Sequence, residues 1–242
     1  MMSCRRVGAA GAVAAVCVLA VLGSAAATAQ QQDASSVIRG VDAAVKARID
    51  GIAGYTVTEH YAVYRNHDET HPVAEMTVKT EYRKETGKSY TILSQSGSEF
   101  IKNHVLEPLL DHEKTFNLPG IREASWITSA NYEMKLKPGG VQRLDGRDCL
   151  ALAITPRRKA TNMIEGTLWV DVRDGSIVRL EGSATQSPSI FTGPAQVMRS
   201  YANVNSFAMA TQARAVSDSF LLGQTVVTID YRDYQIQLGP AR

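Results

Sequence analysis

The feature that most limits how this chain can fold is a long alternation of apolar and polar residues. In residues 55–65, alternate positions on one side are apolar or aromatic: Tyr55, Val57, Tyr61 and Val63. Residues 73–84 repeat the pattern with Met76, Val78 and Tyr82. A period of two sends alternate side chains to opposite faces of a strand, so each segment is predicted to be a strand with one apolar face.

Further segments with strand patterns follow along the chain, most of them bounded by Gly, Pro or Asp-Gly: residues 88–94, 131–137, 149–155, 165–184, 196–204 and 224–236. Consecutive strands with short polar links pair antiparallel. Only two helical segments interrupt them. The predicted fold class is therefore α+β, an antiparallel sheet with a few helices, in one domain over residues 30–242.

Both helical segments are amphipathic. In residues 33–52, the apolar side chains of Val37, Val41, Val45 and Ile49 recur every four residues. Polar residues at the start of this segment can cap the helix. In residues 99–112, Ile101, Val105 and Leu109 belong to a broad apolar arc. We expect this second helix to cover the apolar face of the sheet through these three side chains.

Residues 165–185 place four carboxylates around a turn: Glu165, Asp171, Asp174 and Glu181. A turn at 172–175 with a left-handed Gly175 gives one apolar face, with Val170 opposite Val178 and Leu168 opposite Leu180. The other face pairs Asp171 with Ile177, Thr167 with Glu181, and Trp169 with Arg179, whose guanidinium would lie over the indole ring. A register shifted by one would oppose Val170 to Arg179. The carboxylates are therefore expected on a solvated face and not in a catalytic site.

One other cluster has metal-ligand side chains. His104, Glu107 and Asp111 lie at i, i+3 and i+7 on the polar side of the second helix. Pro108 should kink or divide that helix, and the pattern is not HExxH. We expect a solvated surface, with no metal and no cofactor. The sequence also lacks GxSxG, a glycine-rich phosphate loop and Cys-x-x-Cys, so a binding protein is favoured over an enzyme.

The N-terminus has the order of a secretory signal. Arg5 and Arg6 precede a short apolar run that ends at Ala27-Thr28-Ala29. Residues 1–29 are therefore read as a signal peptide cleaved after Ala29, with a retained anchor as the alternative. The context of Cys17 does not suit lipid attachment, because Val16 and not a small residue precedes it.

Removal of this leader leaves Cys149 as the last cysteine and balances the charges. Cys149 lies in an apolar strand pattern and is expected to be a buried structural thiol. Two of the 26 basic residues lie in the leader, so the mature chain would carry as many basic as acidic residues, 24 of each. That balance gives no support to nucleic-acid binding.

Residues 140–236 resemble the envelope lipoprotein-carrier superfamily, which includes the periplasmic lipoprotein carrier, the outer-membrane lipoprotein receptor and a sigma-regulatory sensor. The resemblance rests on "RLDGRDCLALAITPRR", "IEGTLWVDVRDGSIVRLEG" and "VVTIDYRDYQI". It implies a strongly curved antiparallel half-barrel whose concave side, partly covered by helices, holds acyl chains or a hydrophobic peptide. The arginine that holds the carrier's lid closed has no matching position in this sequence.

The expected function is that of an exported, soluble periplasmic protein that binds lipid or lipoprotein acyl chains and contacts membranes only transiently. The alternatives are a sensor that binds an envelope partner protein through the same groove and, third, a metal-dependent hydrolase. The groove is expected to be lined by apolar residues of four strands: Val57, Tyr61, Met76, Val78, Leu168, Val170, Val178 and Leu180.

Overall fold

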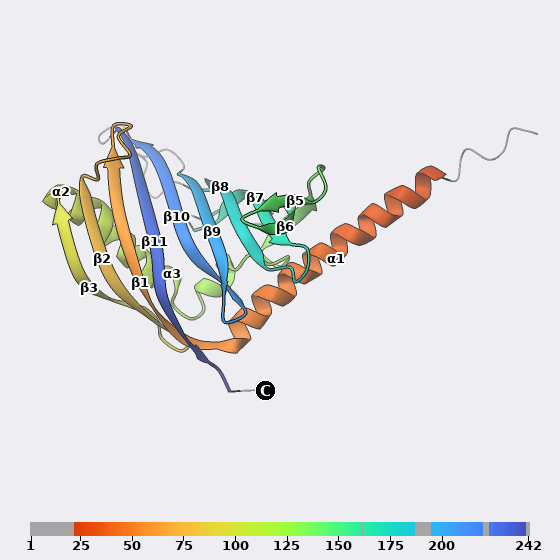
Figure 1. The fold of residues 1–242 in the computed structure, drawn as a ribbon, viewed down its shortest axis with the longest axis horizontal. Helices are drawn as coiled ribbons and strands as arrows, with labels where there is room; N and C mark the ends of the chain where they lie inside the picture. Colours follow the sequence, from red (N-terminus) through yellow and green to blue (C-terminus); the bar gives the residue numbers. More distant parts are fainter. Residues whose placement is uncertain (1–21, 161, 187–194, 220–222, 241–242) are drawn as a thin grey trace, which may run out of the picture.

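A computed structural model describes residues 22–160, 162–186, 195–219 and 223–240 (Figure 1). The helical segments are α1 (Leu22–Gly51), α2 (Glu99–Ile101), the π-helical turn η1 (Lys102–Leu106), α3 (Glu107–Phe116) and the 3-10 turn η2 (Arg122–Ser125). Most of the expected signal peptide, residues 1–21, lies outside the described residues. Within the part of the chain described, no helix is both long enough and apolar enough to cross a bilayer.

The strands are β1 (Ile52–Arg65), β2 (Ala74–Arg83), β3 (Gly87–Gly97), β4 (Tyr132–Leu136), β5 (Gln142–Leu144), β6 (Arg147–Pro156), β7 (Ile164–Asp171), β8 (Ile177–Ala184), β9 (Gln196–Val204), β10 (Phe207–Ser219) and β11 (Gly223–Leu238). They form one antiparallel sheet of 11 strands in the order β3-β2-β1-β11-β10-β9-β8-β7-β6-β4, with β5 beside β6. The ends, β3 and β4, do not pair, and the sheet curves around the helices (Figure 1). The predicted α+β half-barrel is confirmed.

Two hydrophobic cores fill the concave face of this sheet. In the α1 core, Val41 and Val45 of α1 pack on β4, β6, β7 and β8 through side chains that include Leu152 and Leu168. In the cover core, the segment α2-η1-α3, called here the cover helix, packs on β1, β2, β10 and β11. The curved sheet is thus closed by a different helix over each half, and the N-terminal part of α1 extends beyond the sheet (Figure 1).

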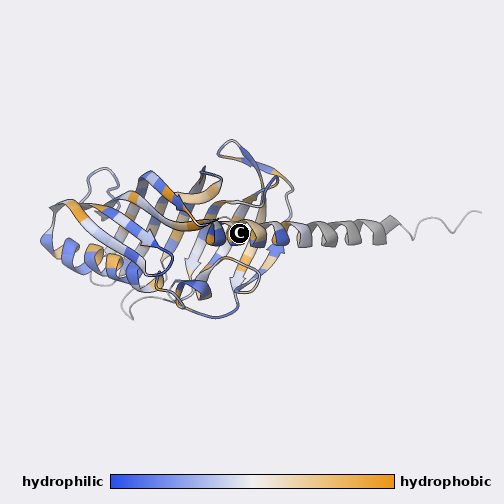
Figure 2. Cartoon of the chain, turned by 90° about the horizontal axis from the view of Figure 1, so that it is seen from below, coloured by the Kyte–Doolittle hydropathy of each residue, from blue (hydrophilic) through white to orange (hydrophobic). Residues whose placement is uncertain are grey.

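The alternation in the sequence explains why each strand buries one face. Along β1 and β2 the pairs Tyr61 with Met76 and Val63 with Ala74 join side chains of the same face. All four are nearly inaccessible to solvent. Figure 2 shows hydrophobic positions interspersed with hydrophilic ones along the strands and helices. Burial of these side chains, each worth about 1.5 to 3 kcal/mol, stabilises the fold without any disulfide among the described residues.

Helix α1 differs from expectation at its start. The helix runs through the residues that were expected to cap it and begins at Leu22. The apolar repeat behaves as predicted, because Val41 and Val45 are buried and Val37 and Ile49 pack beside them. The prediction for the cover helix is also confirmed: Pro108 stands at the start of α3, directly after the π-helical turn.

In the hairpin β7–β8, the observed register agrees with the expected one away from the turn and differs from it next to the turn. Leu168 opposes Leu180 and Trp169 opposes Arg179 as predicted, and Gly175 is left-handed with φ 69°. A β-bulge then makes Val170 oppose Ile177, so the predicted Val170–Val178 and Asp171–Ile177 pairs are wrong. Ile177, not Val178, joins the α1 core.

The polar face of the hairpin also differs. Asp171 is buried, with its side chain 1% exposed, because Arg173 folds back on it with contacts of 2.9 and 3.1 Å. Arg179 forms ion pairs with Asp145 and Glu181. Among the described residues, a cation–π contact is formed by Arg122 over the Tyr82 ring and not by Arg179. The expected solvated face therefore holds for Glu165 and Asp174 but not for Asp171.

Candidate functional site

The candidate site is the concave face under the cover helix, where three of the eight expected groove residues pack together and Val57 is buried on the same strand as Tyr61. Val57 and Tyr61 of β1 and Met76 and Val78 of β2 are each at most 2% exposed. Ile101 is buried against this cluster, and Val105 and Leu109 are partly buried on it. Most of the residues expected to be lining and cover therefore pack against each other in one core.

The other expected lining residues lie under a different helix. Leu168, Val170 and Leu180 belong to the α1 core and are at most 4% exposed. The expectation that the helix of residues 99–112 covers them is wrong, because α1 occupies that half of the concave face. These three residues are as closely packed as those under the cover helix. Amphipathicity identified α1 as a covering helix but could not say which strands it covers.

The lining of the cover core reaches the surface at one edge of the sheet. Ile92 of β3 opposes buried Val78, yet it is 46% exposed. Leu93 is the extra residue of a β-bulge and is 57% exposed, and Phe100 at the start of the cover helix is 52% exposed. These three exposed apolar residues of β3 and of the start of the cover helix are called here the apolar mouth. The apolar lining thus continues from solvent at Ile92 to the buried face at Val78.

A group of buried polar side chains, called here the polar seam, lies beside the cover core. It was not predicted from the sequence. Glu59 occupies the middle of the apolar face of β1, is 1% exposed and accepts a hydrogen bond from the Tyr61 hydroxyl. Tyr231 opposes Glu59 on β11. A single acidic residue within an otherwise apolar alternation is the signal that could have revealed it. Burial of a carboxylate is costly unless it is hydrogen-bonded, which the tyrosine provides.

The seam includes an ion pair that joins the cover helix to the sheet. Lys88 Nζ of β3 lies 2.9 Å from Glu113 Oε2 of α3, and the two side chains are only 10% and 26% exposed. Lys88, and more weakly Arg199, lowers the pKa of Glu113 to about 2 against the opposing effect of burial. Burial alone would lower the pKa of Lys88, but Glu113 raises it well above the ordinary value. Both groups are therefore charged at neutral pH.

Two buried polar atoms near this pair have no hydrogen-bond partner: Tyr90 Oη and Arg199 Nε. Tyr90 is on β3, like Lys88, and its pKa is raised, chiefly by burial. Arg199 on β9 opposes Leu180 of the α1 core, so the seam separates the two cores. Unsatisfied buried donors are few in folded proteins, and two of those in the described residues lie in this seam.

The cluster with metal-ligand side chains lies where it was expected. His104, Glu107 and Asp111 are exposed, and the His104 ring stacks on Phe100 at 4.3 Å. Within the described residues no group of His, Cys, Asp or Glu is arranged to hold a metal.

Alanine at each of His104, Glu107 and Asp111 should change the free energy of unfolding by less than about 0.5 kcal/mol, because the side chains are solvated. Thermal melts with and without added zinc measure this. The comparison variant is Leu106→Ala in the same cover helix, which removes a side chain only 1% exposed and should cost about 2 to 5 kcal/mol. Stoichiometric zinc binding that disappears in the three variants would instead establish a metal site.

Cys149 is buried on the outer face of β6, and its pKa is raised, chiefly by burial. Its Sγ lies 3.6 Å from the carbonyl oxygen of Arg147. The predicted structural thiol is confirmed as a buried one. A thiol with a raised pKa is a poor nucleophile at neutral pH.

No family model and no curated protein matches the sequence. Among solved structures, a putative outer membrane lipoprotein-sorting protein domain from Vibrio parahaemolyticus is similar over 87% of this chain and 95% of its own, with 13% identity and a TM-score of 0.47. A LolA superfamily protein from Nitrosomonas europaea has 12% identity and a TM-score of 0.42 over 86% of this chain and 94% of its own. A DUF1329 family protein from Desulfovibrio piger has 14% identity and a TM-score of 0.42 over 85% and 95%.

Proposed function

We propose that this chain is exported with cleavage after Ala29 and that its concave face binds lipid or lipoprotein acyl chains under the cover helix. The observation that carries the proposal is the apolar mouth, where the lining of the cover core is open to solvent at Ile92, Leu93 and Phe100. An acyl chain that enters there would leave water for apolar surroundings, a gain of about 0.8 kcal/mol for each methylene.

The cover helix has features suited to reversible opening. Its π-helical turn, followed by Pro108, replaces the regular hydrogen bonding between α2 and α3 with a local irregularity inside one helical segment. The Lys88–Glu113 pair fixes its C-terminal part to β3. We therefore place acyl binding between the cover helix and β1–β3, with movement at the N-terminal part.

In this arrangement the expected groove residues divide into two groups. Val57, Tyr61, Met76 and Val78 would line the acyl site, with Ile101, Val105 and Leu109 above them. Leu168, Val170, Val178 and Leu180 would serve the stability of the half under α1. A carrier must also release its ligand, which suits a site closed by a mobile segment better than one closed by a long continuous helix.

Charge placed in the apolar mouth tests the proposal. Ile92→Glu should weaken binding of a fluorescent fatty-acid probe by about tenfold, because a carboxylate beside the path of the acyl chain would have to be desolvated. Its fold should persist, since Ile92 is 46% exposed on an edge strand. The probe's fluorescence, titrated at equal ionic strength, gives the affinity.

Val141→Glu is the matched control, because Val141 is 59% exposed just before β5, in the half of the sheet under α1. It should bind the probe like the unaltered protein. If both variants lose affinity equally, or if the unaltered protein binds no probe, the acyl site is not at this mouth.

A second candidate function is recognition of a partner protein, favoured by the free edge of β3. Residues 91–97 are all exposed, and β3 ends the sheet, so its outer backbone groups can pair with an extended peptide. Native mass spectrometry of the protein taken from its own cell envelope separates the two functions. A bound lipid mass supports the carrier, whereas a stoichiometric polypeptide supports the sensor.

A further inference from the structure

The outer face of the sheet carries a second candidate site, a polar pocket of about 430 Å³. Leu180 faces the α1 core, so its neighbour Arg179 and the residue opposite Arg179, Ser200, point to the outer face. Gln212 of β10 opposes Ser200. The turn between β5 and β6 brings Asp145 and Arg147 over these strands. The pocket is thus separated by the sheet from the apolar lining under the cover helix.

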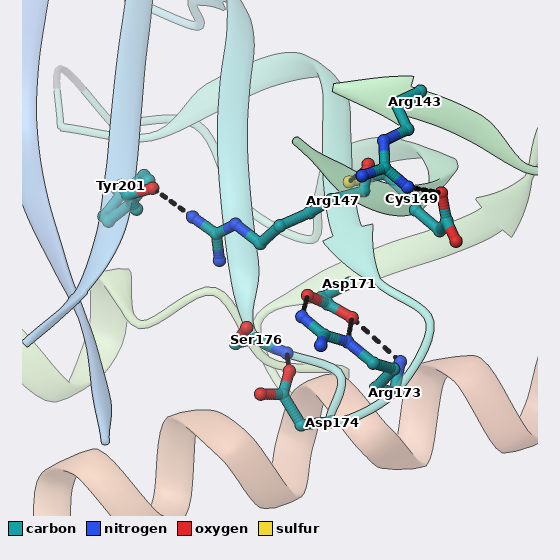
Figure 3. Close-up of polar contacts among 9 residues, drawn as sticks. Arg143, Arg147, Cys149, Asp171, Arg173, Asp174, Ser176 and Tyr201 are labelled. Carbon is teal, nitrogen blue, oxygen red and sulfur yellow. Dashed lines mark hydrogen bonds and ion pairs between the residues drawn. The ribbon is translucent and has the colours of Figure 1, made fainter. Parts of the chain in front are cut away.

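Arg147 reaches across β8 to β9, where its Nη2 donates to the carbonyl oxygen of Tyr201 at 2.5 Å (Figure 3). This bond uses one of the five N–H groups of the guanidinium and does not neutralise its charge. Within the described residues, no ion pair joins Arg147 to a carboxylate, whereas Arg143 on the same hairpin pairs with Asp148 at 3.1 Å. Arg147 therefore brings an unneutralised guanidinium to the pocket.

Arg179 adds a further unused donor. Its Nη2 lies 3.1 Å from Asp145, but its Nε is buried and has no hydrogen-bond partner. The Nε atom has almost no accessible surface, so a ligand oxygen could reach it only if the Arg179 side chain moved. Arg147 is therefore the arginine of the pocket whose donors are open to a ligand.

The acidic residues of the pocket are already engaged. Asp171 accepts three hydrogen bonds from Arg173, and Asp145 pairs with Arg179. Asp174 accepts the backbone N–H of Ser176 at 2.9 Å within the hairpin turn (Figure 3). Asp145 and Asp171 are therefore paired with arginines, whereas Asp174, like Arg147, keeps its charge without an ion-pair partner among the described residues.

We propose that this pocket binds a phosphate ester of a small polyol, with the phosphate held by the guanidinium of Arg147. Guanidinium groups match the oxygens of phosphate in geometry and charge. The volume exceeds that of a bare phosphate, and Ser200, Asn203 and Gln212 along the wall can hydrogen-bond to hydroxyl groups. The ester could be a free metabolite or the headgroup of a phospholipid, since both present the same groups.

Tryptophan fluorescence provides a local readout. The chain has two tryptophans, and Trp169 opposes Arg179 across the hairpin, so the Trp126→Phe protein reports from the pocket through Trp169. Titration with glycerol 3-phosphate should give a saturable change in emission, and glycerol should give none. Arg147→Met in this background should weaken binding by at least about tenfold, the usual loss for a hydrogen bond to a charged group.

Arg143→Met is the matched control, because it removes an arginine that is 70% exposed and already paired on the same hairpin. It should leave the affinity unchanged. If Arg147→Met lowers the melting temperature, Arg147→Lys keeps the charge but not the planar fork, and it should still weaken binding with the melt preserved. Equal loss of binding in Arg143→Met overturns the proposal.

Vesicles distinguish the two sources of the ester. Binding to phosphatidylglycerol vesicles, lost in Arg147→Met but without any response to glycerol 3-phosphate, assigns the pocket to a lipid headgroup. Response to glycerol 3-phosphate assigns it to soluble phosphate esters. Failure with both probes overturns the site, and this outcome is independent of the fatty-acid titration, because the acyl site lies on the other face of the sheet.

Discussion

Replacement of Lys88 by methionine is expected to lower the free energy of unfolding by about 3 kcal/mol, because it leaves the Glu113 carboxylate unpaired in a largely buried place. Urea denaturation measures the loss. The double variant Lys88→Met, Glu113→Leu should recover most of it, since an apolar pair of similar volume needs no charge compensation. If the double variant is as unstable as the sum of the single variants, the pair is not coupled.

Two further measurements sharpen this prediction. Lys46→Met is the control, because Lys46 and Asp50 form an ion pair between side chains 74% and 40% exposed, and its loss should change stability little.

The pH dependence of the stability has a definite sign. The pKa of Glu113 falls from 4.5 to about 2 on folding, so the stabilisation of about 3 kcal/mol is present above pH 4.5 and is lost as the pH falls toward 2. Glu113→Gln should remove that component.

The second large effect is expected at Gly182. Gly182 of β8 opposes Gly166 of β7, and a Cβ atom on Gly182 would stand 2.1 Å from the carbonyl oxygen of Glu165. That distance cannot exist, so the two strands would have to separate. Gly182→Ala should therefore cost at least about 3 kcal/mol or prevent folding, which thermal melts and circular dichroism would detect.

Gly40→Ala in α1 is the control for Gly182→Ala. Its added Cβ would meet the Cα of Gly175 at 3.5 Å, an ordinary contact, and alanine favours the helix by up to about 1 kcal/mol. This variant should be as stable as the unaltered protein or more so. Equal loss in both variants would mean that the close approach of β7 and β8 is not what requires glycine.

The strands that alternate strictly were predictable from the sequence, whereas β5 and β10 were not predicted, and β10 shows why. Along β10 the apolar positions are largely alanines, among them Ala208, Ala210, Ala213 and Ala215, which have a low preference for strands. Its neighbours β9 and β11 supply pairing partners on both sides, and this tertiary context overrides the local preference. The alternation of residues within β10 alone therefore does not reveal this strand.

The candidate site was predictable only in part for a related reason. The alternation identified Tyr61, Met76 and Val78 as lining, because burial of one face repeats along a strand. The Lys88–Glu113 pair could not be found in this way, since its members are 25 residues apart and each is an ordinary surface residue in the sequence. Which helix covers which half of the sheet depends on the path of the chain, and helical periodicity does not specify it.

The position of β11 determines when this protein can finish folding. The sheet order places β11, the last strand of the chain, between β1 and β10, so the N-terminal meander β1–β3 joins the rest of the sheet only through it. Twelve residue pairs link β1 to β11 across more than 150 positions of sequence. If the chain emerges from a translocation pore N-terminus first, β1 of the meander would keep one edge unpaired until β11 has emerged. An unpaired strand edge in an incompletely folded chain favours aggregation, so the yield of folded protein should depend on how long this edge stays unpaired.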